Sequence, residues 1–180
     1  MADDAAMDDS PPLRPTVRVL LLDPQDRLLM MRGRLPSEPG GPSFWFTIGG
    51  GLEPDETLAA AAIRETEEET GLTDIELGSV VWRDEVVLPD PQGRPMLLRQ
   101  SYILAHTAGG QLSRAGWQDL ERDFCDELHW WSLDELRRTT ETLYPEGLVE
   151  LLVDVLAGRI ATEPLVIRTA RGPVAPIPRP

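Results

Sequence analysis

The chain has no lysine. All 17 basic residues among its 180 are therefore arginines, scattered along the sequence, and 31 acidic residues bring the formal net charge to −14. Proteins that bind long nucleic acids cluster Lys and Arg against the phosphate backbone. This balance argues against a nucleic-acid polymer as partner and favours a small-molecule ligand.

Cysteine and long hydrophobic runs are also scarce. Cys125 is the single cysteine, which excludes an internal disulfide and favours a reducing, cytoplasmic location. No apolar run approaches the ~18 residues of a membrane-spanning helix, although 41% of the residues are hydrophobic. Residues 1–15 lack the basic and then apolar order of a signal peptide, so we expect neither a leader nor a membrane partner.

The length suits one domain with a substantial core. We expect a disordered acidic lead over residues 1–14, one domain over 15–160 and an extended Pro/Arg-rich tail over 161–180. Asp23-Pro24-Gln25-Asp26 separates two apolar runs, which predicts a hairpin. Strands are expected at 16–22, 27–31, 44–48, 75–88, 96–106 and 128–132, with helices after the glycines at 49–51, at 133–138 and at 146–156.

Two connections separate these elements. Residues 32–43 are predicted to form a mobile Pro/Gly-rich loop, and residues 107–126 a long irregular connection. Strands interleaved with two main helices favour an α/β fold, in which a mixed sheet is covered on both faces.

Acidic residues are abundant, above all between Gly50 and Leu72. Four glutamates, at positions 65, 67, 68 and 69, stand close together on a predicted helix. Like charges at helical spacing destabilise a helix by roughly 0.2–0.5 kcal/mol per pair. At about 100° per residue, Glu65, Glu68 and Glu69 gather at one margin of the buried face and Glu67 falls on the opposite, solvated flank. Converging oxygen ligands are what Mg²⁺ or Mn²⁺ prefers.

An acidic run by itself most often forms a solvated helix face. Here the turn before it favours a metal site, because Gly49, Gly50 and Gly51 let the backbone approach a ligand closely. Glu53-Pro54-Asp55-Glu56 then suits a helix entry. A bound metal ion would also supply the positive charge that an acidic protein needs to act on phosphates.

This stretch resembles the signature box of the Nudix hydrolases, G-x5-E-x7-R-E-U-x-E-E-x-G-U. Every fixed position is matched, by Gly50, Glu56, Arg64, Glu65, Glu68, Glu69, Gly71 and Leu72. The one departure is Thr66, where the family places a bulky aliphatic residue, and it lies in the apolar arc of the helix. The resemblance implies a Nudix-like α/β/α sandwich with a mixed β-sheet, in agreement with the pattern of elements.

The resemblance also implies the chemistry, which is metal-dependent hydrolysis of a nucleoside diphosphate linked to another group. By analogy, Mg²⁺ or Mn²⁺ would be bound by Glu65, Glu68, Glu69 and the backbone carbonyl of Gly50. Arg64 would hold loop and helix together by pairing with Glu56. An exposed pair with no such role contributes under about 1 kcal/mol, and we prefer the orienting role.

The general base differs among members of this family, some of which use a glutamate of the box and others a carboxylate from a distant loop. Glu121 and Glu127 both precede Trp130-Trp131, where relatives often carry a further acidic ligand. We favour Glu127 as the catalytic residue, because a short strand would fix it better than a loop would fix Glu121. His106 and His129 are expected to be strand residues without a catalytic role.

Substrate identity is less constrained. The predicted substrate-binding residues are Arg32, Trp45, Trp82 and Glu121. Phe46 and Trp117 could also stack on a nucleobase, although tryptophans in strands are more often core residues. Pro89 falls after the box where ADP-ribose hydrolases of this family carry a proline, which favours ADP-ribose or a nucleotide sugar over a nucleoside triphosphate. Pro89 is equally well explained as the first residue of a turn.

Two other functions occur on the same fold. A Nudix-like domain can sense a nucleotide without hydrolysing it, usually with an eroded box, whereas this box is intact. A related isomerase branch uses a catalytic cysteine near the sheet, but Cys125 stands in no such motif. Family members often dimerise, so a homodimer stays open, though nothing in the sequence requires one.

Overall fold

The computed structural model describes residues 10–35, 38, 40–90 and 92–168. In chain order its elements are β1 (Leu13–Leu22), β2 (Leu28–Gly33), β3 (Phe44–Thr47), α1 (Leu58–Thr70), β4 (Glu76–Pro89), β5 (Pro95–His106), α2 (Asp119–Phe124), β6 (Cys125–Trp131), α3 (Leu133–Arg138), α4 (Leu148–Leu156) and β7 (Leu165–Val166). Parts of three segments expected to lack regular structure lie outside the described residues. They are residues 1–9 of the expected disordered lead, residues 36, 37 and 39 of the expected mobile loop, and residues 169–180 of the expected tail.

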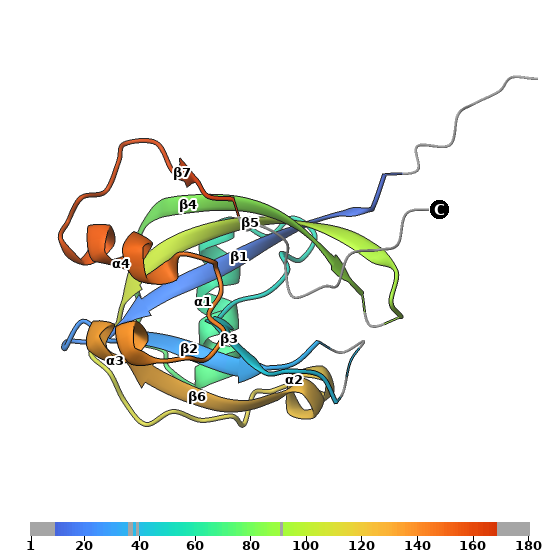
Figure 1. The fold of residues 1–180 in the computed structure, drawn as a ribbon, viewed down its shortest axis with the longest axis horizontal. Helices are drawn as coiled ribbons and strands as arrows, with labels where there is room; N and C mark the ends of the chain where they lie inside the picture. The colour runs from blue at the N-terminus through green and yellow to red at the C-terminus, as the bar shows by residue number, and fades with distance from the viewer. Residues whose placement is uncertain (1–9, 36–37, 39, 91, 169–180) are drawn as a thin grey trace, which may run out of the picture.

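The strands form a mixed sheet that forks (Figure 1). One branch holds β1, β5, β4 and β7, with β1–β5 and β4–β7 parallel and β4–β5 antiparallel. In the other branch β2 pairs with both β3 and β6, antiparallel. The β1–β2 hairpin joins the branches, and within the described chain its ladder is limited to Leu22 opposite Leu28. The two strands therefore diverge from the hairpin end.

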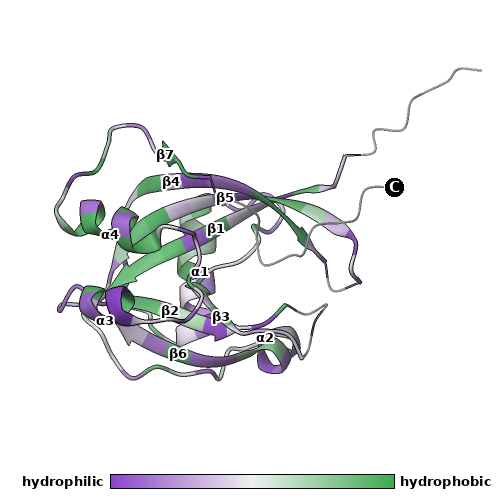
Figure 2. Cartoon of the chain, in the orientation of Figure 1, coloured by the Kyte–Doolittle hydropathy of each residue, from purple (hydrophilic) through white to green (hydrophobic). Residues whose placement is uncertain are grey.

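Helices cover both faces of the sheet, so the α/β/α sandwich is confirmed. Alternate side chains of β1 enter opposite cores, as the period of two in a strand requires. Val19 lies in one hydrophobic cluster with Ala62 of α1, and Leu20 lies in the other with Leu152 of α4. Figure 2 shows hydrophobic residues along β1, β2 and much of α4.

The local signals behave as predicted at the first hairpin and at α3. The Asp23 carboxylate accepts hydrogen bonds from the backbone amides of Gln25 and Arg27 and from the Arg27 guanidinium, which closes the turn. Ser132 caps α3, and Glu135 completes the capping box.

The connection expected to be irregular over 107–126 contains structure. Its end forms α2, capped by Gln118 and Glu121 in a capping box, and β6 begins at Cys125 rather than at residue 128. The earlier start has a clear cause, because β6 keeps pairing with β2 through a bulge, with Glu127 opposite Arg32 and Cys125 opposite Gly33.

The ends of the domain also lie beyond the expected limits of 15 and 160. β1 starts at Leu13, and β7 adds Leu165 and Val166 to the edge of β4. Ile167 follows with its side chain buried and its amide donating to the Arg83 carbonyl at 2.9 Å. Burial of an apolar side chain thus ties the first part of the expected tail to the core. Within the described residues, no helix is both long and apolar enough to cross a membrane.

Candidate functional site

The glycine turn after β3 crosses from one branch of the sheet to the other. β3 pairs with β2, and the next residues bond to β1, with Val19 N to Ile48 O and Val17 N to Gly50 O both at 2.9 Å. Gly49 sits at the crossing with a φ of +122°, and a Cβ there would overlap the Val17 carbonyl oxygen. Only glycine suits this position.

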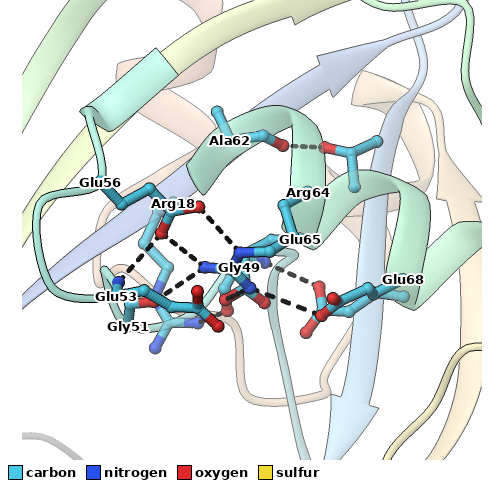
Figure 3. Close-up of polar contacts among 11 residues, drawn as sticks. Arg18, Gly49, Gly51, Glu53, Glu56, Ala62, Arg64, Glu65 and Glu68 are labelled. Carbon is cyan, nitrogen blue, oxygen red and sulfur yellow. Dashed lines mark hydrogen bonds and ion pairs between the residues drawn. The ribbon is translucent and has the colours of Figure 1, made fainter. Parts of the chain in front are cut away.

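Arg64 lies at the centre of a polar network that joins this turn to α1 (Figure 3). Its Nε and Nη2 each donate to a carboxylate oxygen of Glu56 at 2.8 Å, and Nη2 also donates to the Gly51 carbonyl at 3.1 Å. Its Nη1 donates to Glu65 at 2.8 Å and to Glu68 at 3.4 Å. The Arg64 hydrogen bonds lower the pKa of Glu56 to about 2. The predicted pairing of Arg64 with Glu56 is present, and it links the helix entry to the acidic cluster.

Glu69 is the most buried of the acidic side chains on this helix, with 6% of its surface exposed. Its carboxylate accepts a hydrogen bond from the Gly49 amide at 2.7 Å. Burial is the main cause that raises its pKa to about 8, and the nearby Glu65 raises it further. Burial also raises the pKa of Glu65, against the lowering effect of Arg64. The helix therefore holds carboxylates in an environment that favours a compensating positive charge.

A cavity of about 300 Å³ lies between the branches of the sheet, with Gly49 and Glu69 in its wall. Aromatic rings of Phe44, Phe46 and Tyr144 line another part of it. Phe44 lies 5.6 Å from Phe46 and 5.4 Å from Tyr144 between ring centroids. The cavity thus joins an acidic region, which suits a cation, to an aromatic region, which suits a planar ring of a ligand.

The carboxylates suit a hard divalent cation by donor type and by charge. As the side chains lie, however, the described part of the chain contains no group of three or more His, Cys, Asp or Glu arranged around one metal position. Glu65 and Glu68 turn to Arg64, and Glu69 turns to the Gly49 amide. Binding a metal ion would require at least one of these side chains to exchange its present partner.

The backbone carbonyl of Gly50, the predicted metal ligand, takes part in pairing with β1. Gly50 O accepts the hydrogen bond from Val17, and Gly50 packs against Glu65, whose carboxylate oxygen lies 2.5 Å from the place of a Cβ. Gly49, and not Gly50, belongs to the cavity wall.

Three of the predicted substrate-binding residues lie away from the cavity. Trp45 and Trp82 are 2% and 3% exposed and belong to the core on the α4 side. Arg32 pairs with Asp126 and Glu127 at 2.7 and 3.0 Å. Their strand positions place these side chains outside the cavity wall, so the structure does not bring them together with Glu121 there. Trp117, also considered, is buried and donates to the Glu69 backbone carbonyl at 2.7 Å.

The two acids considered for the general base lie in different places. Glu121 of α2 is part of the cavity wall, and its charge helps to raise the pKa of Glu69. Glu127, the favoured residue, lies on β6 in an ion pair with Arg32 and does not belong to that wall. The preference rested on a strand holding a side chain more firmly than a loop, but Glu121 is held by α2.

Sequence reasoning missed Arg18, Phe44 and Tyr144 as cavity residues. The first two face the cavity from β1 and β3, and alternation along each strand was the available signal. Tyr144 is far away in sequence and is placed by pairing with β3, since its amide donates to the Trp45 carbonyl at 2.8 Å.

Comparison with known proteins gives consistent matches. A model described as the NUDIX domain matches residues 12–152. The RNA pyrophosphohydrolase of Caulobacter vibrioides is 30% identical over 159 residues, which cover 83% of this chain and 89% of that protein. The MutT protein of Methanosarcina mazei has a TM-score of 0.57 at 19% identity, over 83% of this chain and 97% of that one. An ADP-ribose pyrophosphatase of Streptococcus suis has a TM-score of 0.54 at 19% identity, over 86% and 97%.

Proposed function

The chain belongs to the Nudix family and is a hydrolase acting on phosphoric anhydride bonds, and from that premise we propose that it cleaves a nucleoside diphosphate linked to another group with the help of Mg²⁺ or Mn²⁺. The observation that carries the proposal is that Glu69 of α1 and the Gly49 turn that holds it both belong to the wall of one aromatic-lined cavity. Phosphate and base of one ligand can thus be held together.

Glu65, Glu68 and Glu69 would hold the metal, with the backbone carbonyl of Gly50 as the predicted further oxygen donor. Bound there, the metal ion would neutralise phosphoryl oxygens and lower the pKa of a water molecule. Residues of the chain itself hold these glutamates in position. Arg64 ties Glu65 and Glu68 to the helix entry through Glu56, and the Gly49 amide fixes Glu69.

We place a nucleobase against the aromatic part of the cavity, because Phe44, Phe46 and Tyr144 form one cluster of contacting rings in its wall. Pro89, the residue that favours ADP-ribose or a nucleotide sugar, lies in the same wall. It is also the last residue of β4, so its position supports this substrate class without excluding a nucleoside triphosphate.

RNA with a 5′-terminal triphosphate is the second candidate substrate, because the relative from Caulobacter vibrioides is named an RNA pyrophosphohydrolase. The net charge of −14 opposes it, since the electrostatic contribution to polymer binding comes from clustered basic residues. We therefore place ADP-ribose and nucleotide sugars first.

A substrate panel tests the function. The protein is incubated with Mg²⁺ or Mn²⁺ and with ADP-ribose, UDP-glucose, a dinucleoside polyphosphate, nucleoside triphosphates or a 5′-triphosphorylated RNA, and phosphate is assayed after addition of a phosphatase. We expect hydrolysis of ADP-ribose or UDP-glucose to be fastest. A panel without turnover but with tight ligand binding would point instead to a sensor domain and would contradict the proposal.

Because Glu121 belongs to the cavity wall and Glu127 does not, we propose Glu121 as the general base. We expect Glu121→Gln to lower kcat by at least about 10-fold, since general acid–base groups typically contribute 10²–10⁴-fold. Glu127→Gln is the matched control and should stay within about twofold of wild type, because Glu127 lies outside the cavity wall. If the Glu127 variant alone lost activity, the assignment of Glu121 would be wrong.

A further inference from the structure

Arg18 is a cavity side chain outside the box, and its guanidinium is fixed by two neutral acceptors. From β1, its Nε donates to Gln100 Oε1 at 2.8 Å and its Nη1 donates to the Gly49 carbonyl at 2.9 Å. The Arg18 Cζ atom lies 5.7 Å from the centroid of the Phe46 ring, within the range of a cation–π contact. The side chain is half-buried, so its orientation is set before any ligand arrives.

Arg18 has no ion-pair partner in direct contact among the described residues, although its charge acts at longer range to lower the pKa of Glu65 and of Glu69. In the part of the chain that the structure describes, the hydrogen bonds of its guanidinium are those of Nε to Gln100 and of Nη1 to Gly49, and neither acceptor is a carboxylate. Arg34, in the same cavity wall, differs in this respect because it pairs with Asp126 at 3.1 Å. Arg14 also belongs to the wall but is exposed. An oriented, partly desolvated guanidinium with free donors is well suited to a phosphate oxygen.

The position of Arg18 indicates which phosphate it would meet. One side of the guanidinium contacts Gly49, whose amide holds Glu69, and the other lies against Phe46 in the aromatic part of the cavity. A ligand with its base at the aromatic rings and its scissile bond near the acidic cluster must pass this point. On the basis of the proposed function, we infer that Arg18 binds the phosphate attached to the nucleoside, and that it does so before metal is bound.

Gln100 acts as a positioning residue in this arrangement. Its Oε1 accepts from Arg18, and its Nε2 lies 3.5 Å from the Tyr102 hydroxyl. The side chain is 6% exposed, and Tyr102 is 3% exposed. Removal of the Gln100 amide would leave the charge of Arg18 in place but release its orientation.

Nucleotide binding without metal tests the inference. In EDTA, Kd is measured by calorimetry for AMP and UMP and for adenosine and uridine. We expect each monophosphate to bind wild-type protein at least about 10-fold more tightly than its nucleoside. Arg18→Gln should reduce this ratio to about 1 without changing nucleoside affinity. Arg18→Lys and Gln100→Leu should give intermediate ratios, because the first keeps the charge without the fork and the second keeps the fork without its orientation.

Arg34→Gln is the matched control, because it removes a cavity arginine that is already paired, and the wild-type ratio should survive in it. Circular dichroism and thermal melts establish that each variant is folded. Equal affinity of wild type for monophosphate and nucleoside would overturn the inference, as would a wild-type ratio in Arg18→Gln or no binding of either nucleotide. These measurements involve no turnover, so a failed substrate panel would refute the proposed function without deciding the role of Arg18.

Discussion

Replacing Glu69 by Gln is expected to abolish most divalent-dependent hydrolysis while leaving the fold intact. Groups that only support a metal ligand are typically worth 10–100-fold, so loss of a ligand charge should lower kcat/KM by at least about 100-fold. The amide oxygen of Gln can still accept the hydrogen bond from Gly49, so the turn should keep its place. The measurement is the rate on the best substrate of the panel at saturating Mn²⁺.

Glu67→Gln is the matched control, because Glu67 lies on the same helix but is exposed, as its place on the helical wheel predicted. It should keep wild-type turnover. Unchanged turnover in Glu69→Gln would refute the metal assignment, and equal loss in both variants would show that the helix charge as a whole is what matters.

The same substitution has a second expected effect, on stability without metal. The pKa of Glu69 is raised to about 8 mainly by burial, so the folded protein favours its protonated form. The contribution of protonated Glu69 to the free energy of unfolding is therefore fully present below the ordinary pKa of a glutamic acid, near 4.3. It is lost as pH rises towards about 8. We therefore measure, in EDTA, the difference between the Tm of wild type and the Tm of Glu69→Gln at each pH. This difference should fall by several degrees between pH 5 and pH 9. A constant difference across that window would contradict the raised pKa.

The sequence predicted the acidic helix well because helical period and charge together leave few arrangements. Thr66 is buried, as its place in the apolar arc required, and its hydroxyl donates to the Ala62 carbonyl, which satisfies a polar group where the family places an aliphatic residue. The buried stripe does not extend to Ile63, which is 38% exposed. The real buried stripe includes Ala61 and Glu69, because this side of α1 meets the Gly49 turn.

The substrate side of the cavity could be predicted much less well. Tryptophan is the largest stacking surface, so Trp45 and Trp82 were natural candidates, yet both alternate into the core on the α4 side. The position of the fork in the sheet decides which face of a strand meets the cavity. The fork arises because β1 pairs with β5 over ten positions but with β2 only at the hairpin. Such non-local pairing leaves no signature in the local pattern of β1 and β2.

Gly49→Ala is expected to cause the largest loss of stability. The residue has a φ of +122°, and an added methyl group would overlap the Val17 carbonyl oxygen in backbone that is itself bonded to the turn. Unfavourable backbone geometry of this kind costs about 1–3 kcal/mol by itself. The steric overlap adds to that cost, so we expect a loss of roughly 3 kcal/mol or more in the free energy of unfolding, measured by urea denaturation.

Gly93→Ala separates the two contributions to that loss. Gly93 has a φ of +81°, but a Cβ there would have no heavy atom within 4 Å, so only the backbone cost of about 1 kcal/mol should appear. If both variants lost the same stability, contact of the turn with β1 would not be what requires glycine at position 49. A larger loss in Gly49→Ala, with Mn²⁺ affinity reduced in the molecules that stay folded, would show that close packing of turn on strand holds Glu69 in place.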